Sequence, residues 1–291
     1  MDSALILRKL RDSGAEISKN EALILLKSSN LIADLTSEVI EKPLFAVWRI
    51  TALAEIPYTE ELDYTKKLIK YIRKNMLTGE GFSLSGKKTD LLPCYNAMLV
   101  EAFSKLGFAD TDFVKAGVNW IKKYQLFERN KKTRWDGKGI KKYGGCMKKI
   151  PCYIGVVKSV KALIYYEKYS SDDDAETEKL IQKGISYIKK HRLYKHLSNE
   201  EPINSHILDI SYPQSYQLNI IELLEIMYLT GNINDKACDA ALNYIKQKKT
   251  SGNFWKTDYI YSGTGYTAFD KRGGKGGWVT CLLEKYTGNI E

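Results

Sequence analysis

Two cysteines stand where the start of a helix would make a thiol reactive. Cys94 and Cys152 each follow a proline, which suits the first position of a helix because the N–H that proline lacks would have no partner there. Helix N-termini and nearby lysines lower the pKa of a thiol, so either cysteine could be a thiolate nucleophile or a metal ligand. The alternative is a small apolar side chain packed beneath a loop. We take Cys152 as the candidate catalytic cysteine.

A zinc site is a second chemistry open to the same cysteine. Cys146 precedes Cys152 by six residues, and the three histidines follow in the next connection. Two sulfurs with one or two imidazoles would give a ligand set that zinc accepts. The spacing matches no compact zinc signature, and two lysines between the cysteines oppose a dication, so zinc is suggested but no cofactor is certain. The candidate metal ligands are Cys146, Cys152, His196 and His206.

The best carboxylate for acid–base chemistry is Asp136, in the loop sequence Arg134-Trp135-Asp136-Gly137. A glycosidase would need a second carboxylate facing the first across a sugar, and the sequence does not show such a pair. Asp136 and Cys152 are therefore the predicted catalytic residues if the protein is an enzyme, which the sequence leaves open.

Five segments predict helices that are buried on every side. The segment 150–166 is apolar on almost every side, and a helix of that kind must be surrounded by protein. The other four begin at Pro43, Pro93 and Pro213 and at Trp278, where the segment runs to Tyr286.

Four further segments predict helices with a single apolar face. Each segment follows the same seven-residue pattern. A small or apolar residue is followed by an apolar one, a variable one, an aromatic one and an isoleucine, and two long polar residues end the pattern. This pattern indicates a helix with one buried face and one solvated face. Their aromatic residues recur about 50 to 70 residues apart, a period typical of helical-hairpin repeats. These segments are 68–74, 117–123, 184–190 and 241–247.

The alternation of the two helix types predicts an all-α fold with an inner and an outer ring of helices. Closing such hairpins on themselves gives an α/α toroid of five to six helical hairpins. We predict one domain over residues 1–291, with N-terminal helices in 1–42 (apolar runs 4–10 and 21–27) and repeats in 43–291. An open solenoid is the alternative, and we favour closure because the inner helices are apolar on more than one face.

The long connections run from outer to inner helices, so the prediction places all of them at one end. The net charge of +10 favours anionic partners, and many of the cations fall in these loops, where helix N-termini add positive potential. Charges that only keep the surface soluble are the alternative. The predicted anion-binding residues are Arg134, Lys138, Lys271 and Arg272.

Aromatic residues stand at or near the starts of the inner helices, where a central cavity would open. Such rings could hold an apolar chain, stabilise a carbocation or stack sugars. The alternative is that the rings simply fill the centre. The predicted ligand-binding aromatics are Trp48, Tyr95, Tyr153, Tyr216 and Trp278.

Composition narrows the class of protein. Five cysteines without a disulfide-scaffold spacing fit a reducing cytoplasm. No apolar run reaches the roughly eighteen residues of a spanning helix, and the start of the chain lacks the order of a signal peptide. Nothing resembles a nucleic-acid-binding module. We expect a cytoplasmic protein with a small-molecule partner and without nucleic acid; peripheral contact with an acidic membrane stays open.

Several motifs resemble one superfamily. Gln247 followed by Gly252-Asn253-Phe254-Trp255 is a Gln…Gly…aromatic repeat ending, with weaker copies at 79–82 and at Gln125 with 135–137. The segment 269–280 is similar to a last repeat. From about residue 43 onward, the chain resembles the terpenoid-cyclase and protein-prenyltransferase toroids, in particular the single-toroid members with prenyltransferase and squalene-oxidase repeats.

The resemblance implies an isoprenoid-sized apolar cavity with a cationic rim, and no named reaction. The Asp-x-Asp-Asp proton donor of the squalene-cyclase-like enzymes is absent from the long-loop end, and so is the Asp-x-Cys zinc pair of the prenyltransferases. The leading hypothesis is a prenyltransferase-like or terpene-cyclase-like protein that holds an isoprenoid or similar apolar ligand, with its anionic head on the basic loops. The alternatives are a non-catalytic toroid that binds a lipid or an acidic protein, and an (α/α) carbohydrate-processing enzyme.

Overall fold

The computed structural model describes residues 1–135, 137 and 151–288, and this part of the chain is mostly helical, which confirms the all-α class. The sheet within it is one short antiparallel pair, β1 (Leu77–Thr78) and β2 (Gly81–Phe82), with Leu77 opposite Phe82. No helix of the described residues is both long and apolar enough to cross a bilayer.

Five inner helices match the predicted buried set in number. Two of them, α4 and α6, begin at a proline, as expected from its fixed φ, and α13 ends at the capping residue Gly288. The inner helices are α4 (Pro43–Ala54), α6 (Pro93–Lys105), α9 (Tyr153–Tyr169), α11 (Ile220–Leu229) and α13 (Gly277–Thr287).

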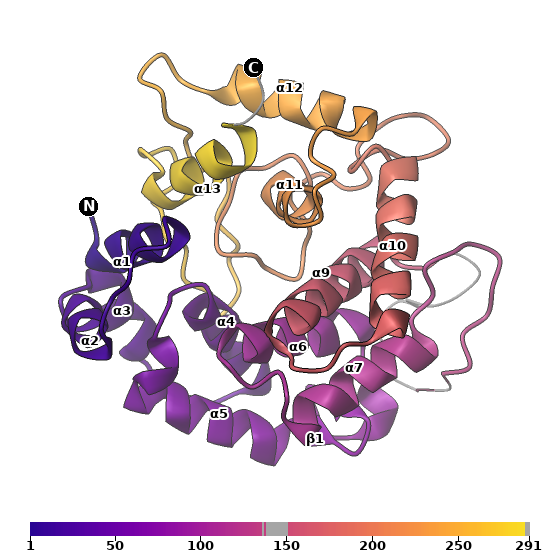
Figure 1. Ribbon diagram of the computed structural model, residues 1–291, viewed down its shortest axis with the longest axis horizontal. Coiled ribbons are helices and arrows are strands. Elements are labelled where there is room, and N and C mark those ends of the chain that lie inside the picture. The colour runs from indigo at the N-terminus through magenta and orange to yellow at the C-terminus, as the bar shows by residue number, and fades with distance from the viewer. Residues whose placement is uncertain (136, 138–150, 289–291) are drawn as a thin grey trace.

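Four outer helices contain the predicted one-sided segments. Each carries acidic residues in its first turn and basic residues in its last, which complements the helix dipole. Figure 1 shows them on the outside of the inner helices. They are α5 (Asp63–Asn75), α7 (Asp112–Tyr124), α10 (Ala175–Lys190) and α12 (Asp239–Lys248).

The first 42 residues form three helices rather than the two predicted runs: α1 (Ser3–Asp12), α2 (Lys19–Lys27) and α3 (Asn30–Thr36). Ser18 and Glu21 cap α2 reciprocally. Helix α1 packs against α13, and α3 packs against α4, so this segment links the last inner helix to the first (Figure 1). Three single turns of 3-10 helix complete the described elements: η1 (Thr59–Glu61), η2 (Lys88–Asp90) and η3 (Lys236–Cys238).

The predicted helix start at Pro213 is wrong. The segment after Pro213 is irregular, and α11 begins only at Ile220. The carbonyl oxygen of Ser215 accepts a hydrogen bond from Lys158 Nζ (2.7 Å), and the Asn219 side chain caps the N–H of Glu222 (3.1 Å). These polar contacts hold 213–219 as a connection and move the helix start downstream.

Two of the long connections lie side by side. The long connections 191–219 and 249–276 are joined by the bond from Phe269 N–H to the Tyr212 carbonyl (3.0 Å). The C-terminal ends of three inner helices line one small cavity: Tyr169 is the last residue of α9, Leu229 is the last residue of α11, and Pro57 follows α4.

Close packing between α10 and α9 predicts the cost of one added methyl group. A Cβ on Gly184 would lie 2.1 Å from Val160 Cγ2, so Gly184→Ala should lower the free energy of unfolding by about 1–3 kcal/mol, in spite of the better helix propensity of alanine. Urea unfolding measures this. The control is Gly79→Ala, because no atom lies within 4 Å of a Cβ there. Equal stability of Gly184→Ala and the parent would contradict the packing described.

Candidate functional site

The centre of the molecule holds a buried ion pair. Lys158 of α9 contacts Glu222 of α11 through both carboxylate oxygens (2.7 and 2.8 Å), and the exposure of the two side chains is 1% and 0%. Removing two charges from water is costly, and a close pair with further hydrogen bonds offsets that cost. The Ser215 carbonyl supplies one such bond to Lys158.

Lys161, one helical turn further along α9, is also fully buried. Its Nζ lies 2.8 Å from Glu225, 3.1 Å from Glu101 and 3.6 Å from Glu222. Burial alone would lower the pKa of Lys161, but the three carboxylates around it raise that pKa well above its usual value. Lys161 is therefore a permanent cation at the centre.

The ion pairs continue toward α4 and α1. Lys105 lies 2.6 Å from Glu101 and 2.7 Å from Glu55, and Arg8 lies 3.6 Å from Glu55. Four cations thus alternate with four anions, all on α1, α6, α9 and α11 or at the end of α4. We call these residues the central charge network: Arg8, Lys105, Lys158, Lys161, Glu55, Glu101, Glu222 and Glu225.

Two small cavities adjoin this network. One of about 80 Å³ lies at the end where the short connections meet, and one of about 10 Å³ lies deeper; both are lined by Glu55 and Lys105. Pockets for organic ligands usually measure about 300–1,000 Å³. The prediction that 150–166 is apolar on almost every side is wrong at Lys158 and Lys161, and the cavities beside them are smaller and more polar than an isoprenoid requires.

Three of the predicted aromatic residues do come together. Trp48 lies 6.3 Å from Tyr95 and 6.4 Å from Tyr216, measured between ring centroids. Tyr261 and Tyr266, which the sequence did not single out, pack on Trp48 at 5.3 and 6.4 Å. Trp48 is buried, whereas the four tyrosines around it are only half-buried, so the rings pack against one another and still expose part of their surface.

The other two predicted aromatics lie elsewhere. The Tyr153 hydroxyl donates to the Leu193 carbonyl on the side of α10, and its ring is buried. Trp278 packs against Tyr212 and Phe269 at 6.1 and 4.7 Å. Both are core residues.

The predicted cationic rim is only partly described. Arg134, Lys271 and Arg272 are all exposed, and Arg272 Nε donates to the Asp258 carbonyl (2.9 Å). No contact among the described residues joins Arg134 to the other two. Lys138 and the predicted acid–base residue Asp136 lie outside the described residues.

The cysteines and histidines do not assemble into a metal site within residues 1–135, 137 and 151–288, where no three His, Cys, Asp or Glu side chains are placed to hold an ion. His196 is exposed, and His206 Nδ1 lies 2.7 Å from Asp209. Cys146 lies outside the described residues. Cys152 is the N-cap of α9 instead of its second residue.

Cys94 does occupy the second position of α6, but it is not a thiolate. Burial raises the pKa of its thiol to about 12, and the neighbouring Cys152 adds to this effect. Desolvation outweighs the helix N-terminus, so the expected activation of Cys94 is wrong.

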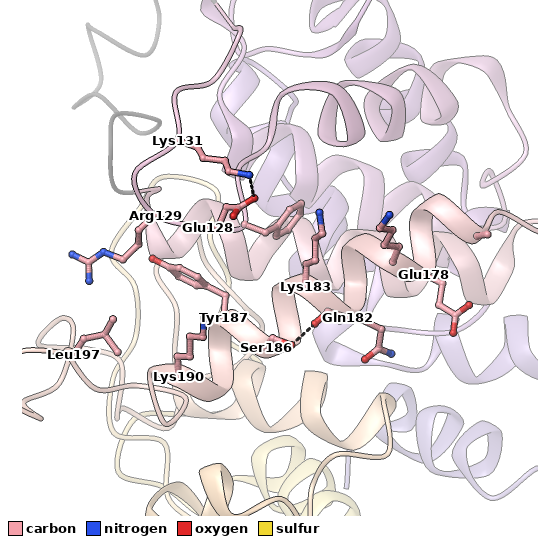
Figure 2. A pocket seen from close by; sticks show the side chains of 13 residues that line it. Glu128, Arg129, Lys131, Glu178, Gln182, Lys183, Ser186, Tyr187, Lys190 and Leu197 are labelled. Atoms are coloured by element: carbon pink, nitrogen blue, oxygen red, sulfur yellow. Dashed lines mark hydrogen bonds and ion pairs between the residues drawn. The ribbon is translucent and has the colours of Figure 1, made fainter.

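A groove of about 1,110 Å³ lies on the outer side of the molecule, along the solvated face of α10. Figure 2 shows that the chain around Glu128, Arg129 and Lys131 forms a second wall and that Leu197 lies at one end. Sequence analysis took this face of α10 for a solvated surface and did not single it out. The lining residues are Phe127, Glu128, Arg129, Lys131, Ala175, Glu178, Lys179, Gln182, Lys183, Ser186, Tyr187, Lys190 and Leu197.

The groove attracts negative charge. Its lining holds five cations and two carboxylates, and one of these carboxylates, Glu128, is paired with Lys131 at 2.6 Å. The hydrogen bond from Lys131 lowers the pKa of Glu128, and the charges of Lys183 and Lys190 lower it further. The excess of cations over carboxylates in the lining gives the groove a positive charge.

The chain was compared with protein-family models, with curated proteins and with solved structures, and none of the three comparisons finds a match.

The central ion pair predicts strong coupling between two substitutions. Lys158→Met and Glu222→Leu should each lower the free energy of unfolding by about 3–5 kcal/mol, because each leaves a buried charge without its partner. The double variant should lose about 1–3 kcal/mol less than the sum. Chemical unfolding measures all three. The same cycle on the exposed pair Lys19–Glu61 (2.7 Å) should give a coupling below about 1 kcal/mol. Additive losses at the central pair would refute its role.

Glu55 predicts how stability depends on pH. Burial would raise its pKa, but Lys105, Lys161 and Arg8 lower it from 4.5 to about 2. A carboxyl with a lowered pKa stabilises the fold above the unfolded value and loses that contribution as the pH falls through the folded one. We expect unfolding free energy to drop between pH 4.5 and 2, by roughly 3 kcal/mol from Glu55.

Unfolding of Glu55→Gln over the same pH range should show a flatter dependence. The exposed carboxylate Glu16 supplies the control, because Glu16→Gln should keep the dependence of the parent. A Glu55→Gln protein that is as sensitive to acid as the parent would show that other groups control the acid transition.

Proposed function

We propose that this protein is a non-catalytic α/α toroid that binds an acidic segment of a partner protein in the groove along α10. The positive potential in that groove is the observation that carries the proposal. The proposal develops the second of the three hypotheses drawn from the sequence.

The toroid is supported by contacts between elements far apart in the chain. Neighbouring inner helices pack in the order α4, α6, α9, α11 and α13, and α13 packs against α1. Since α1, α2, α3 and α4 pack in succession, the inner helices return to their own beginning (Figure 1). An open solenoid would leave α13 and α1 apart.

Binding on the outer surface agrees with the small size of two cavities near the centre. The central charge network and the rings around Trp48 lie among the inner helices, and the cavities beside the network measure about 80 and 10 Å³. The isoprenoid hypothesis stays a prediction, because no observation on the described residues tests it. The carbohydrate hypothesis rests on Asp136, which lies outside the described residues.

The groove has the size and composition of a peptide-binding surface. Its volume of about 1,110 Å³ exceeds the usual range for small ligands, and the net charge of the chain is +10, which steers acidic partners toward it. Phe127 and Tyr187 supply buried apolar surface beneath the cations, and Leu197 is 48% exposed. Apolar contact combined with cations suits an acidic protein segment better than a free inorganic anion.

Charge reversal in the groove tests the proposal. Lys179→Glu combined with Lys183→Glu should weaken the binding of a fluorescein-labelled, glutamate-rich peptide at least about tenfold, because two attractions become repulsions. Fluorescence anisotropy in low salt measures the affinity, which should fall as salt is added.

The matched control is Lys70→Glu with Lys74→Glu, which reverses two exposed lysines with the same spacing on α5. This variant changes the net charge equally and should bind within about twofold of the parent. If both double variants lose affinity to the same extent, only overall charge attracts the peptide. In that case the groove is not the site.

A further inference from the structure

We infer that the acidic segment lies in the groove as an extended strand, with carboxylates at every second position facing α10. This inference rests on the proposed function and specifies the partner that the groove selects.

The cations of α10 form a row on one face of the helix. The groove residues of α10 follow one another at spacings of three and four, which places them on one side, and Lys179, Lys183 and Lys190 are exposed there. No ion pair among the described residues engages these three lysines, whereas Lys131 on the opposite wall is paired with Glu128. The row is therefore available for carboxylates from another chain.

The spacing of this row matches a strand. At a rise of 1.5 Å per residue, Lys179 and Lys183 stand about 6 Å apart along the helix axis. Side chains on one face of an extended chain repeat about every 6.7 Å. Carboxylates at positions i and i+2 would thus face Lys179 and Lys183. A third carboxylate, at position i+4, would lie about 13 Å from the first along the strand. The Cα of Lys190 lies about 16 Å from that of Lys179 along the helix, so the flexible Lys190 side chain can reach this third carboxylate.

A helical partner fits less well. A helix rises only 1.5 Å per residue, so it needs about eleven residues to follow the row from Lys179 to Lys190, and it is about 10–12 Å across. An extended chain is thinner and reaches the same three lysines with only five residues.

The charge of the groove differs between its two ends, and this difference determines where the strand binds most tightly. Figure 2 shows Arg129 and Lys190 near Tyr187 at one end, with Leu197 beyond them, and Glu178 at the other end. Glu178 repels carboxylates beside Lys179, so the Arg129–Lys190 end provides the stronger attraction. An acidic residue at that end should contribute more than one near Glu178.

Three labelled peptides of identical composition test the inference. Each peptide contains four glutamates and four threonines. In the first the glutamates alternate with threonine, in the second they form one block, and in the third they are spaced by three and four residues as on one face of a helix. Anisotropy with the full chain measures binding. We expect the alternating peptide to bind about fivefold tighter than the other two. Lys183→Gln should abolish this preference, and Lys70→Gln should keep it.

The outcomes separate this inference from the proposed function. If all three peptides bind equally and lose affinity in Lys179→Glu/Lys183→Glu, the groove binds acidic segments but the strand is wrong. Tighter binding of the helix-spaced or block peptide also overturns the strand. If no peptide binds, or if a single-stranded oligonucleotide of equal charge binds far more tightly than every peptide, the acidic protein partner itself is wrong.

Discussion

The requirement that every buried charge has a partner controls this structure. Lys158 and Lys161 project from one helix into the buried interior, and Glu222 and Glu225 contact them from the next inner helix. Lys105 extends the same matching to Glu55. An apolar interface tolerates small shifts of one helix along another, but a shift here would separate charges that cost several kcal/mol to leave unpaired. The network therefore fixes the register of the inner helices.

This constraint also decides where a ligand can bind. The two cavities beside the charge network are small, which favours the surface of the outer helices as the candidate binding site. The outer helices need only one apolar face to pack. Their solvated faces are free to vary, and on α10 that face carries the lysines that shape the groove.

Much of the fold could be predicted because helix periodicity is local. The outer helices follow from their amphipathic pattern, and α4, α6 and α13 from their apolar segments and terminal residues. The start of α11 was missed because the polar contacts of 213–219 come from distant residues such as Lys158. The charge network could have been predicted in part from the sequence. Two lysines three residues apart, Lys158 and Lys161, lie in one apolar segment, and two glutamates with the same spacing, Glu222 and Glu225, lie in another. The groove joins 127–131, α10 and Leu197, and no sequence motif connects them.

The contact between the two chain ends has a consequence for biosynthesis. Lys285 of α13 binds Asp12 of α1 at 3.0 Å across 273 residues, and Asp12 also holds Arg8 at 3.0 Å. A ribosome makes α1 long before α13, so α1 is without these partners while the residues between them are made. Contacts of such long range form slowly and leave apolar surface uncovered meanwhile. The packing of α1 against α13 therefore cannot begin before α13 has been synthesised, and until then the uncovered face of α1 is a natural binding site for a chaperone.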